Sequence, residues 1–267
     1  MTQKPYLFTD LDRTMIFSKR FLSPNQPLIP VEYKGKTIIS YMTPQALKLT
    51  QQHIKNIIPV TTRTLEEFKR VKPYQEAKWA IVGNGSIILH HGQALSEWNA
   101  HITKQIAPIQ NEYTQIINWL NQDYPHYLNR LATERDSFIF AKVRPEHKEQ
   151  LKQVLCDKLG TLPQWHFVIQ KQKVYIMPKV ISKENAIQHL INLLKPQEIF
   201  FAGDGSLDIN MINLSQTIPN AHSFTPENTD AHKAAQTPHL TVVSNQPDGA
   251  EEILQHVFPS RGSTHAI

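Results

Sequence analysis

The chain has 267 residues, of which 40% are hydrophobic and 19% are charged, which is the balance of an ordinary globular protein. Its one cysteine, Cys156, excludes an internal disulfide and fits a reducing compartment. No apolar stretch approaches the roughly 18 residues that a membrane span needs. The first predicted strand follows Pro5 directly and leaves no room for a signal peptide, so we expect a cytoplasmic protein.

The formal net charge of +5 is compatible with nucleic-acid binding or with a small anionic substrate. The lysines and arginines are scattered, and the sequence contains no dense basic run and no basic-aromatic motif. A mild positive field suits a small anion. We therefore expect neither a nucleic-acid partner nor a membrane partner.

Strands and helices alternate in the first and last thirds of the chain. In the first third, apolar runs at 6–9, 57–60 and 79–82 predict strands, and helices are predicted to begin after Thr43 and near Thr64. The last third predicts a helix from Ser182, a strand to Ala202, a helix from about Asp208, a strand near Phe224, a helix near Asp230 and a strand at 240–243. Repeated βα units predict an α/β fold, with a Rossmann-like, doubly wound parallel sheet core formed by residues 1–86 and 180–267.

The middle of the chain, residues 87–179, has a different pattern. Helices are predicted at about 109–120 and 146–159, and strands at 137–143, 165–170 and 173–177. The last two strands form a predicted hairpin around Lys171 and Gln172. The mixture predicts an inserted α+β cap domain, which we expect to lie over the core as a lid.

Four aspartates follow predicted buried strands. Asp10 and Asp12 come after the first strand, and Asp204 and Asp208 lie in the segment Gly-Asp-Gly-Ser-Leu-Asp after the strand that ends at Ala202. The carboxyl ends of parallel strands form the ligand crevice of an open α/β sheet, where four carboxylates would repel one another without a cation between them. Each pair taken alone also fits a turn or a helix cap. Together they predict a divalent-metal phosphoryl-transfer site.

Thr61 and Lys183 are two further candidates for contacts with a phosphoryl group. Thr61 ends the second strand, where its hydroxyl would either donate to a phosphoryl oxygen or cap the next helix. Lys183 follows the predicted cap Ser182, and in the first turn of a helix the dipole disfavours a cation. Lys183 is therefore either solvated or attracted by nearby carboxylates and phosphate.

The order of these motifs resembles the haloacid dehalogenase superfamily of phosphatases, over essentially the whole chain. The motifs are Asp10-Leu11-Asp12-Arg13-Thr14, Thr61 before Arg63, Lys183, and Gly203-Asp204-Gly205-Ser206-Leu207-Asp208. The place of the insertion resembles the C2 cap type, in the branch with sucrose-phosphate and mannosyl-3-phosphoglycerate phosphatases. The segment 60–64 is also similar to members found among tellurium-resistance genes. Arg13 stands where many members have glycine, and Leu207 where the fourth motif commonly has asparagine.

The resemblance implies a role for each motif residue. Asp10 would attack phosphorus and form an aspartyl phosphate, and Asp12 would protonate the leaving group and then deprotonate water. Thr61 and Lys183 would hold the phosphoryl group. The implied cofactor is Mg²⁺, bound by Asp10, the backbone carbonyl of Asp12, Asp204 and Asp208. The remaining candidates for substrate binding are Arg63, Asn84, Arg130, Arg135, Lys142 and Arg144.

The function predicted on this basis is magnesium-dependent hydrolysis of a phosphomonoester of a small metabolite, for which a sugar-like compound is one candidate. A phosphomutase or other phosphotransferase would use the same aspartyl phosphate and pass it to a hydroxyl group instead of water. A non-catalytic binding module is a third alternative, against which the intact aspartates and Lys183 argue. The cap residues would contact the leaving group, or else form a solvated face.

Overall fold

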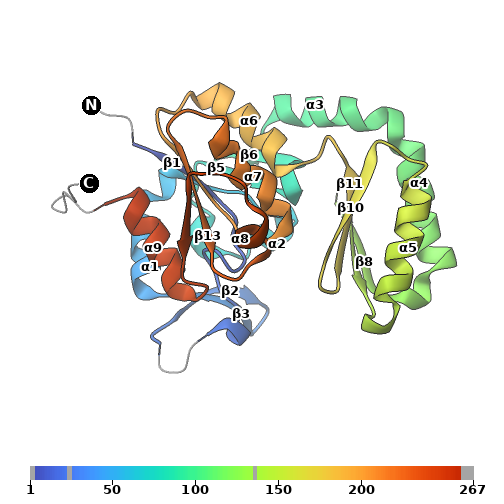
Figure 1. Ribbon diagram of the computed structural model, residues 1–267, viewed down its shortest axis with the longest axis horizontal. Coiled ribbons are helices and arrows are strands. Elements are labelled where there is room, and N and C mark those ends of the chain that lie inside the picture. The colour runs from blue at the N-terminus through green and yellow to red at the C-terminus, as the bar shows by residue number, and fades with distance from the viewer. Residues whose placement is uncertain (1–3, 23–25, 135–136, 260–267) are drawn as a thin grey trace.

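A central parallel sheet organises the molecule, shown as a computed structural model in Figure 1; the structure describes residues 4–22, 26–134 and 137–259. Five strands lie in the order β14-β13-β12-β1-β4, and all neighbouring pairs are parallel. The strands are β1 (Tyr6–Thr9), β4 (Ile57–Pro59), β12 (Ile199–Ala202), β13 (Ala221–Pro226) and β14 (Leu240–Val243). The predicted parallel sheet is confirmed.

Helices cover both faces of this sheet because its strands bury side chains on both sides. In β1, Leu7 belongs to the hydrophobic core on one face and Phe8 to the core on the other. The first face is covered by α1 (Pro44–His53) and α9 (Pro247–Val257), and the second by α3 (Ser96–Ile106), α6 (Lys183–Leu194) and α7 (Ile209–Asn213). The core is therefore doubly wound, as predicted. The short helices α2 (Leu65–Phe68) and α8 (Asp230–Ala234) complete it.

Side-chain caps explain where several helices begin. The hydroxyls of Thr43, Thr64 and Ser182 accept hydrogen bonds from the backbone N–H groups of Ala46, Glu67 and Asn185. The helices predicted to begin after Thr43, near Thr64 and at Ser182 are thus α1, α2 and α6.

Two parts of the core differ from the sequence prediction. Strand β5 (Trp79–Val82) pairs antiparallel with β6 (Ile87–His90), which in turn pairs with β7 (Gln93–Ala94). An isolated parallel bridge between Val60 and Ile81 joins this sheet to the end of β4. A hairpin of β2 (Ile29–Lys34) and β3 (Thr37–Met42) was not predicted, although Ile29, Val31 and Tyr33 alternate along β2 with the period of a strand. The pairing of the two strands contains bulges between Pro30 and Tyr33.

The inserted part contains a four-stranded antiparallel sheet in the order β10-β11-β9-β8. Its strands are β8 (Leu128–Glu134), β9 (Phe138–Val143), β10 (Trp165–Gln170) and β11 (Lys173–Pro178). Helices α4 (Gln110–Asn118) and α5 (Lys148–Leu159) pack on one face, where Ile139, Val174 and Ile176 are buried. Because side chains alternate along a strand, the other face carries Phe138, Tyr175 and Met177.

The boundary between core and cap at residue 87 stays a prediction. Packing favours a later boundary, since Ile88 of β6 and Trp98 and Ile102 of α3 lie in the core on the second face of the central sheet. The indole N–H of Trp98 also donates to the carbonyl oxygen of Gly85 at 3.0 Å.

Among the residues that the structure describes, none of the helices combines the length and the apolar character of a membrane span.

Substituting Gly85 tests the close contact between the turn that follows β5 and the backbone of Ser182, which precedes Lys183. Its φ is +102°, and a Cβ atom there would lie 2.2 Å from the carbonyl oxygen of Ser182. We expect Gly85→Ala to lower the free energy of unfolding by more than about 2 kcal/mol, because the backbone must shift as well as adopt a strained conformation. Gly92→Ala is the matched control, since φ is +73° there and no atom lies within 4 Å; we expect a cost of about 1 kcal/mol. Equal costs in thermal or urea unfolding would contradict the predicted clash.

Candidate active site

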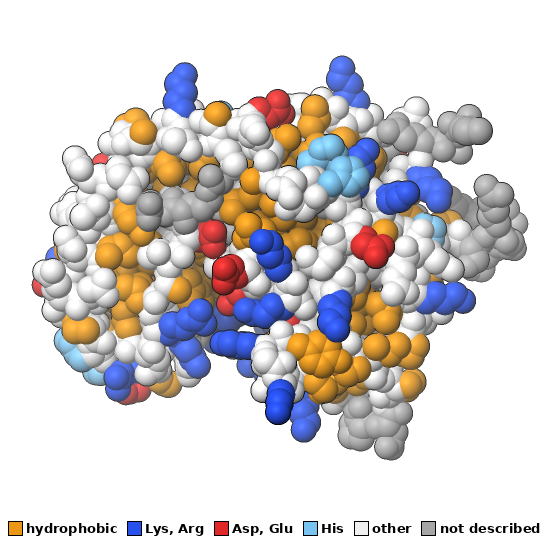
Figure 2. Space-filling view, turned by 180° about the vertical axis from the view of Figure 1, so that it is seen from behind, with side chains coloured by type: hydrophobic (Ala, Val, Ile, Leu, Met, Phe, Trp, Pro, Cys, Tyr) orange, Lys and Arg blue, Asp and Glu red, His pale blue; other side chains and the backbone are white. Residues whose placement is uncertain are grey.

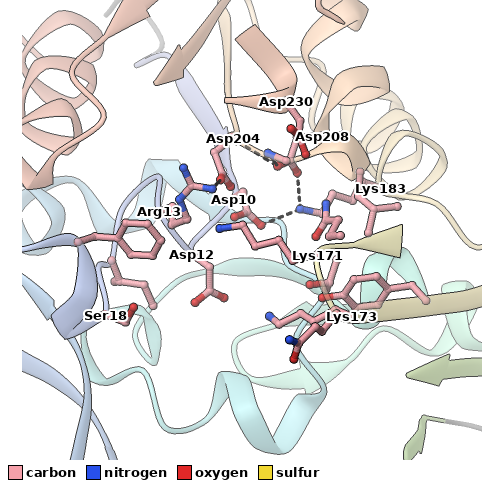
Figure 3. A pocket seen from close by; sticks show the side chains of 18 of the residues that line it. Asp10, Asp12, Arg13, Ser18, Lys171, Lys173, Lys183, Asp204, Asp208 and Asp230 are labelled. Atoms are coloured by element: carbon pink, nitrogen blue, oxygen red, sulfur yellow. Dashed lines mark hydrogen bonds and ion pairs between the residues drawn. The ribbon is translucent and has the colours of Figure 1, made fainter. Parts of the chain in front are cut away.

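The predicted catalytic residues follow neighbouring parallel strands at one edge of the central sheet. Asp10 comes directly after β1, and Thr61 and Asp204 lie two residues beyond β4 and β12, which flank β1. One carboxylate oxygen each from Asp10, Asp204 and Asp208 lie within 4.8 Å of one another. All three side chains are buried and face the same cavity of about 430 Å³ (Figure 3). The predicted convergence of these carboxylates is confirmed.

Lys183 neutralises part of this cluster. Its ammonium Nζ lies 2.7 Å from Asp10 Oδ1 and 2.6 Å from Asp208 Oδ1, and the residue is 1% exposed. The lysine occupies the first residue of α6, where the helix dipole disfavours a cation. The two carboxylates compensate, so the structure favours the attracted lysine over the solvated one (Figure 3).

Backbone groups orient the second pair of aspartates. The Oδ2 atom of Asp208 accepts hydrogen bonds from the backbone N–H groups of Asp204 at 3.1 Å and Gly205 at 2.8 Å. A Cβ atom on Gly203 would lie 2.5 Å from the Asp208 side chain, so only glycine fits there. Arg13, one of the departures from the family pattern, forms an ion pair of 3.0 Å with Asp204.

Burial and mutual repulsion change the proton affinity of the cluster. Burial, with repulsion from Asp208 and Asp12, raises the pKa of Asp10 to about 7 despite the attraction of Lys183. Burial, with repulsion from Asp10 and Asp208, raises the pKa of Asp204 to about 8. Burial would lower the pKa of Lys183, but its two carboxylate partners outweigh burial and raise it. Lys183 therefore stays charged. Asp10 and Asp204 are only partly ionised at neutral pH, because one lysine and one arginine do not fully offset burial and the repulsion within the cluster.

A divalent cation fits this donor set. Three carboxylate groups offer the hard oxygen ligands that Mg²⁺ prefers, and the raised pKa values show that the cluster lacks neutralising charge. Asp10, Asp204 and Asp208 are the residues that would hold the ion. The Asp12 carboxylate does not belong to this group of described residues. The predicted contribution of the Asp12 backbone carbonyl to the metal site stays a prediction.

Asp12 is held by Arg63 in a fork. The guanidinium Nε and Nη2 atoms lie 2.7 and 2.8 Å from the two carboxylate oxygens of Asp12. The same guanidinium donates at 2.7 and 3.0 Å to Glu32, a fully buried carboxylate on β2 that also accepts from Ser40. Burial alone would raise the pKa of Asp12, but the charge of Arg63 and its hydrogen bonds outweigh burial and lower the pKa. Both carboxylates thus compete with substrate for Arg63, which was predicted to contact substrate directly.

Two threonines lie beside this fork. Thr61 is fully buried, and its hydroxyl oxygen accepts from the backbone N–H of Arg63 at 3.2 Å. Its predicted contact with a phosphoryl group stays a prediction. The neighbouring Thr62 lines the main cavity and a second cavity of about 250 Å³ that adjoins it at Asp12. Thr62 is not among the predicted site residues, although its position directly after Thr61 is a signal in the sequence.

The other predicted substrate-binding residues lie in different places. Lys142 lines the main cavity, and Arg130 lines the second cavity with its guanidinium over the Phe140 ring. Asn84 is buried, and its amide nitrogen contacts the Met177 sulfur at 3.0 Å. Arg144 directs its guanidinium to the carbonyl oxygen of Leu128. Neither Asn84 nor Arg144 is among the residues that line the two cavities; Arg135 lies outside the described residues.

The cap contributes residues that the sequence analysis did not single out. Lys171, Lys173 and Tyr175, from the β10–β11 hairpin, line the main cavity. Strand alternation places Lys173 and Tyr175 on the face of the cap sheet that is opposite α4 and α5. Leu207, the second departure from the family pattern, packs against Phe138, Tyr175 and Met177 on this face. This residue therefore connects the fourth motif to the cap.

Comparisons with known proteins agree with this arrangement. Residues 137–254 match a family model described as haloacid dehalogenase-like hydrolase. No curated protein sequence matches the chain.

Solved structures cover nearly the whole chain. The sucrose-phosphatase of Synechocystis sp. PCC6803, in complex with sucrose and phosphate, has a TM-score of 0.65 at 17% identity, and the match covers 96% of this chain and 98% of that one. A HAD/COF-like hydrolase from Plasmodium vivax has a TM-score of 0.64 at 14% identity, with 96% of both chains covered. A trehalose-6-phosphate phosphatase related protein has a TM-score of 0.60 at 15% identity, with 94% and 96% covered. At these identities the likeness shows the fold.

The family model, the fold and the assembled motifs together confirm the predicted resemblance. The matched family model and the shared fold both indicate an enzyme similar to the haloacid dehalogenase-like hydrolases.

Proposed function

We propose that this enzyme is a magnesium-dependent phosphatase that hydrolyses a phosphomonoester of a small metabolite in the cytoplasm. The observation that carries the proposal is the buried cluster of Asp10, Asp204 and Asp208 around Lys183, which opens into a cavity of about 430 Å³. A phosphoryl dianion and a divalent cation would together match the charges of this cluster. Mg²⁺, when bound, would polarise the phosphoryl group and neutralise its charge.

Asp10 is the proposed nucleophile. A carboxylate oxygen of Asp10 attacks phosphorus, the bond from phosphorus to the leaving-group oxygen breaks, and Asp12 transfers a proton to that oxygen. Water then attacks the phosphorus of the aspartyl phosphate while Asp12 takes a proton from that water. The bond between phosphorus and the Asp10 oxygen breaks, which restores the Asp10 carboxylate and releases inorganic phosphate. Lys183 and Thr61 hold the phosphoryl oxygens through their ammonium and hydroxyl groups.

The bidentate ion pair between Arg63 and Asp12 favours the role of Asp12 as the base that accepts a proton from water. Because Arg63 lowers the pKa of Asp12, this residue rests as a carboxylate, which is the form that takes a proton from water. To act first as an acid, Asp12 must gain a proton. A phosphoryl dianion bound beside Asp12 raises the pKa of its carboxyl by like-charge repulsion and favours that proton.

The two adjoining cavities suit a small leaving group. Asp12 lines both, so a leaving-group oxygen within hydrogen-bonding reach of Asp12 lies where they meet. The second cavity has Phe138, Phe140 and Tyr175 in its wall, and such flat apolar faces suit a sugar ring. The Synechocystis enzyme of the same fold, which binds sucrose and phosphate, supports a sugar-like substrate class.

The test is phosphate release from a panel of phosphorylated metabolites. We expect hydrolysis of at least one small sugar-like phosphate with Mg²⁺ and loss of activity with EDTA. Measuring inorganic phosphate separates hydrolysis from transfer to a second hydroxyl group, because a phosphomutase would form an isomeric ester and release no phosphate. Absence of phosphate release across the panel, with Mg²⁺ bound, would contradict the proposal.

Magnesium binding should depend on pH. Since the pKa values of Asp10 and Asp204 are raised to about 7 and about 8, both groups hold protons at lower pH, and the metal must displace them. We expect the apparent affinity for Mg²⁺ to rise between about pH 6 and pH 8.5, by up to about tenfold per pH unit for each proton released. Calorimetry at pH 7 in two buffers of different ionisation enthalpy measures the protons. Equal affinities at the two pH limits, without proton release, would contradict the prediction.

A further inference from the structure

The main cavity has two walls of opposite charge. The core supplies Asp10, Asp12, Asp204, Asp208 and Asp230. The cap supplies Lys142, Lys171 and Lys173, and Arg20 extends this positive side from the short helix Lys19–Phe21. Lysine and arginine side chains gather around the hollow between the two parts of the molecule in Figure 2.

The two walls differ in how their charges are paired. On the core side, Lys183 pairs with Asp10 and Asp208, Arg13 with Asp204, and Arg63 with Asp12. On the cap side, Lys142, Lys171 and Lys173 are exposed. Within residues 4–22, 26–134 and 137–259, none of these three lysines forms an ion pair with a carboxylate. The cap wall therefore offers positive charge that no ion pair among the described residues neutralises.

The charge balance of the cavity leaves room for one more anionic group. Its lining contains six cationic side chains (Arg13, Arg20, Lys142, Lys171, Lys173, Lys183) and five carboxylates (Asp10, Asp12, Asp204, Asp208, Asp230), a balance of +1. A divalent cation and a phosphoryl dianion cancel each other, so the proposed catalytic complex keeps this +1, concentrated on the cap wall.

Geometry connects this charge to the leaving group. Asp12 and Lys173 both line the main and the second cavity, and the charge of Asp12 acts on Lys173. In the proposed mechanism, the leaving group would extend from the phosphorus at Asp10 past Asp12 to the part of the main cavity that the β10–β11 hairpin lines with Lys171 and Lys173. Figure 3 shows Lys171 and Lys173 on the cap side of Asp10 and Asp12.

We propose that the substrate is a phosphomonoester whose leaving group carries a second anionic group, a carboxylate or a second phosphoryl group, bound by Lys142, Lys171 and Lys173. This inference rests on the proposed phosphatase function and narrows its substrate class. Three lysine side chains on the cap wall of the cavity attract such an anion and favour it over a neutral analogue.

The experiment compares phosphomonoesters that differ by one charged group. Glycerol 3-phosphate against 3-phosphoglycerate tests a carboxylate, and fructose 6-phosphate against fructose 1,6-bisphosphate tests a second phosphoryl group. For at least one pair, we expect kcat/KM to be about 10- to 100-fold higher for the member with the extra charge, as one charge-assisted contact provides. The preference should weaken as ionic strength rises.

Two sets of substitutions test whether these three lysines cause the preference for the substrate with the extra charge. In the variant Lys142→Gln/Lys171→Gln/Lys173→Gln, the ratio of kcat/KM within the preferred pair should fall to nearly one. The matched control is Lys48→Gln/Lys104→Gln/Lys152→Gln, which removes the same charge from exposed lysines outside both cavities and should keep the ratio. The single variant Lys171→Gln should show a ratio of kcat/KM between those of the wild type and the triple variant. It replaces the triple variant in the test if the triple variant is unstable.

The outcomes separate this inference from the proposed function. Hydrolysis of both members of each pair at equal kcat/KM would overturn the inference and leave the phosphatase function standing, and a preference that survives the triple substitution would overturn the assignment to these lysines. If nothing is hydrolysed, calorimetry with the same pairs on the Asp10→Asn variant still tests the site. Tighter binding of the member with the extra charge, lost in the triple variant, would support the proposed anion site. Equal affinities for the two members of each pair would overturn it.

Discussion

Replacing Asp10 with asparagine is expected to lower the rate of phosphate release by at least about 10⁴-fold, because the amide lacks the nucleophilic oxygen that forms the aspartyl phosphate. Asp10 is buried at the end of β1, and its carboxylate lies 2.7 Å from the Lys183 ammonium, which is proposed to hold the phosphoryl group. Initial rates on a generic phosphoester with saturating Mg²⁺ measure the loss.

The stability of the Asp10→Asn variant should change little. The raised pKa of Asp10, about 7, means that the folded protein already holds this carboxyl in its neutral form about half of the time at neutral pH. A neutral amide of the same size therefore fits the site, and we expect Mg²⁺ binding to Asp204 and Asp208 to persist. Asp230→Asn is the matched control, because this aspartate lines the same cavity and has no proposed chemical role. Phosphate release close to the wild-type rate in Asp10→Asn would remove Asp10 from the nucleophile role.

Replacing Lys183 with methionine should impair both activity and stability. Methionine fills the space of the lysine stem but leaves Asp10 and Asp208 facing each other without a cation. Loss of a buried ion-pair partner costs about 3 to 5 kcal/mol, which corresponds to a drop in Tm of roughly 10 °C for a chain of this length. Loss of the donor to the phosphoryl group should reduce kcat by about 10²- to 10³-fold.

The loss of stability in Lys183→Met should depend on pH and on metal. At low pH Asp10, whose pKa is raised to about 7, takes up a proton and no longer repels Asp208, so the difference in Tm from the wild type should be smaller at pH 5.5 than at pH 8. Mg²⁺ should raise the Tm of the variant more than that of the wild type, because the cation replaces the missing charge. Lys179→Met, at an exposed lysine four residues earlier, is the control. A metal-independent loss of stability that is equal at both pH values would contradict the electrostatic explanation.

The chemistry of the core site was predictable from sequence because each residue is tied to a strand end or a helix start. Asp10 and Asp204 follow short apolar runs, and neighbouring parallel strands must bring such residues to one edge of the sheet. Lys183 follows Ser182, whose hydroxyl caps α6 and fixes the first turn of the helix beside those strands. Local pattern and sheet topology together leave little freedom in the placement of these groups.

The partners of Arg63 and the positive wall of the cavity depended on tertiary structure. Arg63 was predicted to reach substrate, but a buried glutamate on an unpredicted hairpin, Glu32 of β2, lies on the other side of its guanidinium. Its fork can join Asp12 and Glu32 only because the hairpin packs against the catalytic edge, and no pattern near Arg63 encodes that contact.

The sequence by itself determined the doubly wound core, the order of the motifs and the nature of the groups proposed to hold the metal, since strand burial and helix caps depend on neighbouring residues. Only the tertiary structure decided which cap residues reach the cavity. Lys142 was predicted to contact substrate and Lys171 and Lys173 were not singled out, yet all three line the cavity wall, whereas Arg144 extends towards the carbonyl oxygen of Leu128. Strand alternation assigns a side chain to a face of the cap sheet, but the packing of that sheet against the core decides which part of the face meets the active site.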